Sequence, residues 1–383
     1  MPGRFNGGVI AGTIAGFAAG WNVTNVGAIA SVTAEAYGIA LASVGLFTTA
    51  LFTTHLAMQV PGGRLVDRLG ARRMCIVGVA TIACGCALSM LAPIAWLAIA
   101  ARLLTGVGTG LAFIAGTAYV RRSGGSALAQ GLYGGIGLAA GGLALAVVPE
   151  LVGRLSWRAP YASGLVLAGI GLVVLALAPG DRVVQDAGSR ARPSAGVLRD
   201  RSLYPLALLY SCTFGLALVL SNWVTELLDR HGVGSAGAIG ALILTLGIVT
   251  RPLGGWIMRS RPELVRVTIG LSLAAGALGS ALLAVASSSP VALAACLLLG
   301  IGGGISFAPA FTGAATLRPD APATAVGLVN GTAAATILIC TPLVGLAFAL
   351  PGDGRVGFAA AAVLWLAMLC ALPSRGALGV ERA

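Results

Sequence analysis

Charged residues are scarce in this chain. Asp, Glu, Lys and Arg make up only 9% of the 383 residues, whereas hydrophobic residues make up 57%. Because a soluble domain carries about 25% charged residues, this composition excludes an ordinary soluble protein. Apolar runs of about 20 residues, the length that crosses a bilayer, follow one another along almost the whole sequence. The lipid bilayer is therefore the first partner that we expect.

Lysine is absent, and all 24 basic residues are arginine, which gives a formal net charge of +12. A strongly basic chain can indicate a nucleic-acid partner. Here most of the arginines lie in short segments between apolar runs, where membrane topology explains them. We therefore expect no nucleic-acid partner.

Acidic residues and metal ligands are missing from the middle of the apolar runs. All 12 Asp and Glu residues lie in loops or at the ends of runs, and the only two histidines are His55 and His231. The seven cysteines form no CxxC pair and lie in apolar runs, where Cys behaves as a small hydrophobe. We expect no metal, no cofactor, no disulfide and no enzymatic activity, because a membrane-embedded active site needs clustered polar groups.

The apolar runs predict an all-α membrane protein with twelve transmembrane helices. The first run is too long for a cleavable signal and predicts a first span. A polar segment at 180–202 separates a six-helix half at 1–179 from a six-helix half at 203–383. The predicted spans are 8–30, 39–61, 73–92, 94–117, 128–149, 159–179, 203–225, 236–256, 266–286, 290–312, 324–348 and 357–373.

The distribution of arginine predicts the orientation of these spans. With a cytoplasmic N-terminus, 18 arginines fall in cytoplasmic segments and four in outer loops. The positive-inside rule favours this arrangement. We expect a multi-pass protein of the bacterial cytoplasmic (inner) membrane with both termini in the cytoplasm.

The two halves repeat one another. The segment "TGVGTGLAFIAG" matches "LGIGGGISFAPA" at an offset of 194 residues, "QVPGGRLVDR" matches "RPLGGWIMRS" at 192, and "AQGLYGG" matches "AVGLVNG" at 196. Three matches at nearly one offset indicate a pseudo-symmetric six-span repeat. Such repeats are typical of transporters in which one half moves against the other.

Three motifs give the chain a resemblance to the major facilitator superfamily. They are "GGRLVDRLGARR" (62–73), "RLLTGVGTG" (102–110) and "SWRAPYASG" (156–164). The resemblance implies a secondary transporter that works by alternating access. It also implies a conformational latch in the first motif, with candidate residues Gly62, Gly63, Asp67, Arg68 and Arg72. The glycine–proline signature of antiporters is degraded, since Leu138 stands where that signature has proline.

A further motif, "TRPLGGW" (250–256), resembles the eighth span of nitrate/nitrite porters. Those porters pair the arginine of this motif with an arginine in the second span. Gln59 stands at the equivalent second-span position here. The resemblance to these porters is thus partial, and nitrate itself is not favoured.

Two arginines fall inside spans. Arg251 costs a few kcal/mol at membrane depth unless it faces a cavity or a partner, and a guanidinium can hold an oxyanion with two parallel hydrogen bonds. The alternative is that it extends toward the cytoplasm. For Arg102 the resemblance implies a role in coupling, and the alternative is a structural arginine bonded to carbonyls of a neighbouring helix.

Further polar residues inside spans are candidates for substrate contact. His55 and Gln59 are four residues apart and share one helix face, and His55 could carry a coupling proton. Asn22 and Asn25 place amides in the first span, where helix–helix hydrogen bonding is the equal alternative. Asn222 occupies a comparable place in the second half.

Two arginines and no carboxylate inside the spans predict an electropositive binding site. We expect a secondary active transporter, working as a monomer, for a small anionic solute that binds Arg251, Asn22, Asn25, His55, Gln59 and Asn222. The solute would enter by symport with protons or by exchange for a counter-anion. The alternative is an efflux pump for hydrophobic or drug-like compounds, although such pumps for cations usually need a buried acid.

Overall fold

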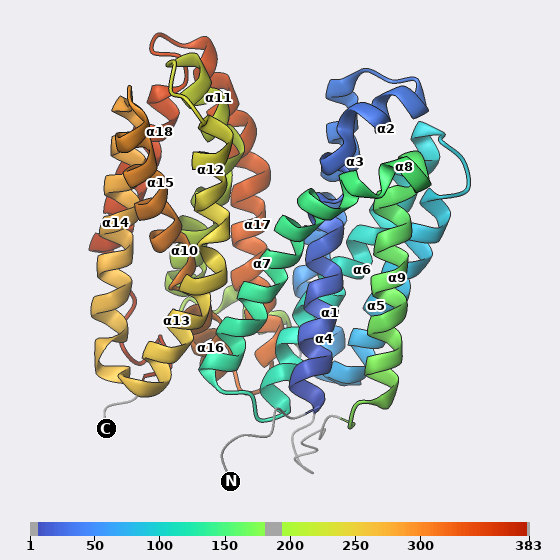
Figure 1. The fold of residues 1–383 in the computed structure, drawn as a ribbon. Helices are drawn as coiled ribbons and strands as arrows, with labels where there is room; N and C mark the ends of the chain where they lie inside the picture. The colour runs from blue at the N-terminus through green and yellow to red at the C-terminus, as the bar shows by residue number, and fades with distance from the viewer. Residues whose placement is uncertain (1–6, 181–193, 381–383) are drawn as a thin grey trace. The chain divides into compact units, whose positions relative to one another are not determined.

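The computed structural model describes residues 7–180 and 194–380, and all regular structure in these residues is helical (Figure 1). Residues 181–193, within the predicted 180–202 linker, and the terminal residues 1–6 and 381–383 lie outside the described residues. Contacts divide the chain into two compact units. Unit 1 contains Met1–Gly125, Ile136–Ala195 and Asp320–Gly327, and unit 2 contains Ser126–Gly135, Gly196–Pro319 and Leu328–Ala383. The predicted division into 1–179 and 203–383 stays a prediction.

Unit 1 is a helical bundle, to which α7 and α17 each contribute a part. Its helices are α1 (Gly7–Thr24), α2 (Ala30–Tyr37), α3 (Gly45–Ala57), α4 (Gln59–Leu69), α5 (Ala71–Ser89), α6 (Ala95–Arg122), most of α7 (Ala127–Glu150), α8 (Val152–Leu155) and α9 (Ala159–Leu177). Short 3-10 turns lie at Gly27–Ile29, Leu41–Val44 and Ser156–Arg158, and a further one, Ser194–Arg199, begins in unit 1 and ends in unit 2.

Unit 2 is a second bundle. Its helices are α10 (Tyr204–Tyr210), the π-helical segment η5 (Ser211–Gly215), α11 (Leu216–Arg230), α12 (Ala236–Thr245), α13 (Gly247–Ser260), α14 (Val265–Val285), α15 (Ser289–Gly304), α16 (Phe307–Leu317), most of α17 (Pro322–Leu346) and α18 (Arg355–Cys370). The 3-10 turns η6 (Pro262–Leu264) and η7 (Ala347–Ala349) connect its later helices.

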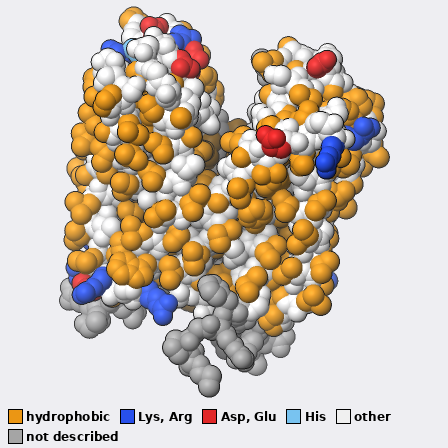
Figure 2. Space-filling view, in the orientation of Figure 1, with side chains coloured by type: hydrophobic (Ala, Val, Ile, Leu, Met, Phe, Trp, Pro, Cys, Tyr) orange, Lys and Arg blue, Asp and Glu red, His pale blue; other side chains and the backbone are white. Residues whose placement is uncertain are grey.

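Nine helices within the described residues are long and apolar enough to cross a membrane. The shorter apolar helix α18, with α1 and the α3–α4 pair, occupies the remaining predicted spans. Figure 2 shows charged side chains near the ends of the helices in each unit and apolar side chains over the sides between them. This distribution is the one that a hydrocarbon environment requires.

The predicted ends of the first two spans are wrong. The first helix ends at Thr24, before the predicted end at 30, and α2 is a separate helix. The second span breaks at Met58 and continues as α4 to Leu69, beyond its predicted end at 61. The helix outlasts the apolar run because one face, with Gly62, Gly63 and Val66, is buried while Arg68 is exposed. The turn follows at Gly70, whose φ of 94° suits glycine.

Each unit has one central helix, and the two central helices correspond to one another in the repeat. In unit 1, α6 packs against α1, α3, α4 and α5, and in unit 2, α15 packs against α12, α13 and α14. These central helices carry the repeated glycine motifs. A Cβ at Gly106 would lie 2.1 Å from the carbonyl oxygen of Leu51, and a Cβ at Gly300 would lie 3.0 Å from that of Leu242. Glycine therefore allows the close helix packing on which both bundles depend.

Candidate functional site

Arg251 lies inside unit 2 with only 3% of its surface exposed. It belongs to α13, which begins after a break at Leu246 and contains Pro252. Its Nη1 donates a hydrogen bond of 2.9 Å to the carbonyl oxygen of Gly134, on the part of α7 that belongs to unit 2. Arg251 is thus held within the protein and does not extend to the surface.

Two aromatic rings pack against the Arg251 guanidinium. Its Cζ lies 4.7 Å from the ring centroid of Phe214 and 4.7 Å from that of Phe307. Tyr210 stacks on Phe214 at 5.2 Å and contacts Phe311 edge-on at 5.1 Å. Cation–π contacts of this kind contribute about 2 kcal/mol when water is excluded. They stabilise a charge that would otherwise be costly at this depth.

The helices around Arg251 depart from regular α-helix. The residues from Ser211 to Gly215 form a π-helical segment between α10 and α11. On the neighbouring span, α15 and α16 are separated at Ile305–Ser306, and the hydroxyls of Thr213 and Ser306 lie 2.5 Å apart. Such irregular segments are common at functional sites, and inside a membrane they need protein or polar partners. The irregular segments of unit 2 therefore lie beside its buried arginine.

One edge of the guanidinium, called its free edge below, forms no well-aligned hydrogen bond to a described residue. Among the residues that the structure describes, Nε and Nη2 of Arg251 and the hydroxyl of Tyr210 are buried without a well-aligned hydrogen bond. The Tyr210 hydroxyl interacts with the guanidinium as a side-chain hydrogen bond of poor geometry. Leaving a buried donor unsatisfied costs about 1–3 kcal/mol, and more for a charged group. This edge is the strongest indication of a ligand within unit 2.

Arg102 has contrasting surroundings inside unit 1. It is completely buried, and all three of its guanidinium nitrogens donate to protein acceptors. The acceptors are the carbonyl oxygens of Asn22 at 2.7 Å and Phe47 at 3.4 Å, and Asn25 Oδ1 at 3.4 Å. Asn25 in turn donates to the carbonyl oxygen of Pro160 at 2.8 Å. The structure thus brings Arg102, Asn22 and Asn25 together as one hydrogen-bonded cluster.

His55 and Gln59 lie together in unit 1 on either side of the break at Met58. His55 Nδ1 is 3.1 Å from Thr109 Oγ1 of α6, and its ring lies between Phe52 and Phe113. The side-chain amide of Gln59 donates to the carbonyl oxygen of His55 at 3.0 Å. Both residues are buried. Asn222, on α11 of unit 2, is exposed.

The first motif is anchored by Asp67. Its carboxylate accepts hydrogen bonds from the backbone N–H groups of Ala323 (3.0 Å) and Thr324 (2.9 Å) and from the Thr324 hydroxyl (2.7 Å), all at the start of α17. These residues belong to unit 1. Arg122 Nη2 lies 3.6 Å from the same carboxylate. Asp67 therefore caps the positive end of α17.

The other residues of the first motif have different environments. Gly63 lies against the start of α17, whereas Gly62 has ordinary van der Waals surroundings. Arg72 donates to the carbonyl oxygens of Leu175 (3.0 Å) and Ala176 (2.9 Å) at the end of α9, and Arg68 is exposed. Arg72 thus satisfies carbonyls that a helix C-terminus leaves free.

The sequence reasoning missed the aromatic residues around Arg251. Tyr210 and Phe214, and likewise Phe307 and Phe311, are four residues apart, so each pair lies on one helix face. This spacing is a signal, but it is equally typical of core packing. In 7–180 and 194–380, no group of three His, Cys, Asp or Glu residues is placed so that it could hold a metal ion. None of the seven cysteines, all of which the structure describes, forms a disulfide.

Comparison with known families gives one clear match. A family model described as Major Facilitator Superfamily matches residues 12–341. No curated protein matches the sequence significantly. The model match covers most of the chain and both repeated halves.

Several solved structures share the fold. The transporter FucP in the outward conformation is 15% identical over 98% of each chain, with a TM-score of 0.75. The proton:xylose symporter XylE is 12% identical over 95% of this chain and 94% of its own, with a TM-score of 0.77. The human organic anion transporter MFSD10 is 17% identical over 96% and 100%, with a TM-score of 0.75. At these identities the likeness shows the fold alone. It confirms the predicted all-α membrane fold of twelve helices in two pseudo-symmetric halves.

Proposed function

This chain belongs to the major facilitator superfamily of membrane transporters, and we propose that it moves a small anionic solute across the bacterial cytoplasmic membrane by alternating access. The arginine distribution supports the proposed membrane orientation, with both termini in the cytoplasm. We propose that the monomer is the working unit, since each chain carries its own Arg251.

The observation that carries the proposal is the free edge of Arg251. Nε and Nη2 present two parallel N–H donors, the geometry that carboxylate, nitrate and phosphate groups match. Within 7–180 and 194–380, no Asp or Glu forms an ion pair with Arg251. A fixed, desolvated cation without a protein counter-charge favours an anion from outside the protein. The hydroxyl of Tyr210 supplies a third donor beside it.

The remaining predicted site residues divide into two groups in this proposal. We assign Asn22 and Asn25 to the support of Arg102, because their amides are engaged in that cluster. His55 and Gln59 stay candidates for proton coupling and solute contact, and Asn222 stays a candidate for solute contact. FucP is described as a fucose:proton symporter and XylE as a proton:xylose symporter. This supports proton coupling by analogy of fold only.

The resemblance to nitrate/nitrite porters narrows the choice of anion. The segment "TRPLGGW" supplies Arg251, but Gln59 replaces the second arginine of those porters. One guanidinium with neutral surroundings favours a singly charged anion with one carboxylate or similar oxyanion group. MFSD10 is described as an organic anion transporter, and an organic anion is the solute class that we propose.

The test is a thermal-shift screen of the purified protein with acetate, benzoate, nitrate, phosphate and a lipophilic cation. We expect a monocarboxylate to raise the melting temperature of the wild type and of the control Arg154→Gln, which alters an exposed arginine of unit 1. Arg251→Gln should lose the shift. Equal shifts in wild type and Arg251→Gln contradict the proposal. Stabilisation by lipophilic cations that is indifferent to Arg251 favours the efflux alternative instead.

A further inference from the structure

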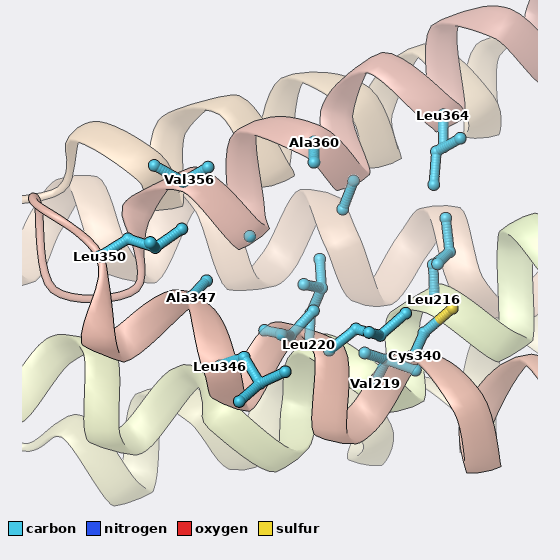
Figure 3. Close-up of a pocket in the computed structure, with 14 residues that line it drawn as sticks. Leu216, Val219, Leu220, Cys340, Leu346, Ala347, Leu350, Val356, Ala360 and Leu364 are labelled. Atoms are coloured by element: carbon cyan, nitrogen blue, oxygen red, sulfur yellow. The ribbon is translucent and has the colours of Figure 1, made fainter.

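Unit 2 contains an apolar groove that the proposed function does not use. It lies between α11, α17 and α18 and has a volume of about 370 Å³. Every one of its lining residues is Leu, Val, Ala, Gly or Cys. Figure 3 shows Leu350 and Val356 at the end beside the turn that joins η7 to α18, and Leu216, Leu364 and Cys340 at the other end.

Several side chains that line the groove are exposed on the surface of unit 2. Leu343, Leu346 and Leu364 are 55%, 67% and 52% exposed, and in a membrane-spanning helix such side chains meet lipid. Its volume holds about a dozen groups of the size of a water molecule, at about 30 Å³ each. From Val356 to Leu364 the groove follows eight residues of α18, or about 12 Å. This length fits part of a hydrocarbon chain.

Apolar surface alone does not select an occupant, because lipid tails are as apolar as leucine. A second observation selects one. Arg355, next to Val356 at the end of the groove, has a buried Nε without a hydrogen bond to any described residue. The acidic groups nearby are engaged elsewhere: Arg230 Nε donates to Glu226 at 2.6 Å, and Arg230 Nη1 lies 3.9 Å from Asp353. Arg355 thus supplies a cation for an anionic head group.

We propose that this groove binds a phospholipid, with one acyl chain between α11, α17 and α18 and the phosphate at Arg355. The predicted topology places Arg355 in an outer loop, so the lipid would come from the outer leaflet. The chain end would then cover Cys340, at the opposite end of the groove from Arg355. The groove is a site for a membrane lipid within unit 2, independent of the solute that binds Arg251.

Cys340 reports on the occupant. The test is the rate of alkylation by N-ethylmaleimide in detergent, read at each cysteine by peptide mass spectrometry. Cys84 and Cys370 are exposed and serve as references in the same sample, whereas Cys340 is partly exposed. Dioleoyl phosphatidylglycerol should slow alkylation of Cys340 about tenfold at a lipid concentration ten times its Kd. Dihexanoyl phosphatidylglycerol, whose chains are too short to span the groove, should leave Cys340 reactive.

Two variants separate the head group from the chain. In Arg355→Gln, phosphatidylglycerol should protect Cys340 no better than dioleoylglycerol, which lacks the phosphate, while Arg154→Gln should behave as wild type. Ala360→Trp should fill the groove and slow alkylation of Cys340 without added lipid. The control Val363→Trp changes an exposed residue of the same helix outside the lining and should not.

Two results of the alkylation experiment would contradict the lipid proposal. Protection of Cys340 that only equals that of Cys84 and Cys370 overturns the proposal, because detergent exchange would then explain it. Equal protection by phosphatidylglycerol and dioleoylglycerol in the wild type overturns the role of Arg355. Neither result depends on the solute, so the proposed function stands or fails separately.

Discussion

The two arginines inside the spans have contrasting hydrogen-bond partners. Arg102 donates from all three guanidinium nitrogens to protein oxygens, whereas Arg251 forms one well-aligned hydrogen bond, from Nη1, and none from Nε or Nη2. Every guanidinium nitrogen of Arg102 already donates to a protein oxygen in a completely buried setting, and removing Arg102 leaves these buried acceptors unsatisfied. We therefore assign structure to Arg102 and solute binding to Arg251, and each assignment predicts a different phenotype.

Replacing Arg102 should destabilise the protein. Arg102→Leu leaves the carbonyl oxygen of Asn22 and Oδ1 of Asn25 without their donor, and each unsatisfied buried group costs about 1–3 kcal/mol. Thermal unfolding in detergent should show a clearly lower melting temperature, together with poor expression. Arg154→Gln is the matched control. Wild-type stability of Arg102→Leu contradicts the assignment.

The contact between the Phe214 ring and the Arg251 guanidinium should give a coupling energy between these two residues. Phe214→Leu removes one ring from the guanidinium face, so stability should fall by about 2 kcal/mol in the wild-type background. In the Arg251→Gln background the cost should be smaller, because only packing is lost. Denaturant unfolding of the four proteins in a double-mutant cycle measures the difference. Additive effects would show that the ring serves packing alone.

At the scale of elements, the contact between α4 and the start of α17 depends on two residues of the first motif. Asp67 caps α17, and Gly63 permits the close approach. A Cβ at Gly63 would lie 2.6 Å from both the carbonyl oxygen of Ala323 and the Cα of Thr324. Backbone atoms cannot move aside as a flexible side chain does, so this approach requires glycine.

Gly63 and its neighbour should differ in tolerance. Gly63→Ala forces α4 and α17 apart and should cost about 1–3 kcal/mol, as overpacking does. Gly62→Ala meets its nearest atom, Leu111 Cδ1, at 3.5 Å, and should be neutral or slightly stabilising because alanine favours helix. Melting temperatures of the two variants test this directly. Equal effects would contradict the close contact.

The cap on α17 predicts a further effect. Asp67→Ala leaves the N–H groups of Ala323 and Thr324 without their acceptor and should cost about 0.5–2 kcal/mol, the usual range for helix caps. Asp229→Ala changes an exposed carboxylate of α11 and should have little effect. Hydrogen exchange at Ala323 and Thr324 is the measurement. Unchanged protection in Asp67→Ala would exclude the cap.

Part of this arrangement was predictable from the sequence. Arg251 and Arg102 stand out because a charge in an apolar run is unusual, and the glycine-containing repeats indicated two matching halves. The partner of Asp67 was not predictable, since Ala323 lies 256 residues away and backbone donors leave no mark in a sequence. The π-helical segment at Ser211–Gly215 was missed for a similar reason, because its spacing reads as ordinary helix.

The span boundaries show where composition is misleading. The apolar run of the second span stops near residue 61, but α4 continues to Leu69. Packing of its glycine face, and not hydrophobicity, decides where that helix ends. Helix boundaries set by tertiary contacts are therefore the least predictable feature, whereas the number of spans followed from the apolar runs and the repeat from the matched segments.

At the scale of the whole molecule, the family is shown, and the anionic solute is proposed from the charges inside the spans. The fold belongs to a superfamily of transporters, and the described spans contain two buried arginines but no mid-span carboxylate. An electropositive interior favours anions, since a charge in hydrocarbon is stable only with a counter-charge or a polar partner. Selectivity for anions should therefore depend on Arg251 and not on Arg102.

The most direct test of this central claim is solute flux in proteoliposomes. Purified wild type should accumulate a radiolabelled monocarboxylate when an inward proton gradient is imposed. Arg251→Gln, at a melting temperature equal to that of the wild type, should show uptake reduced about tenfold or more, because it loses a charge-assisted pair of hydrogen bonds. Arg251→Lys, which keeps the charge but not the paired donors, should be intermediate. Full uptake by Arg251→Gln would contradict the account.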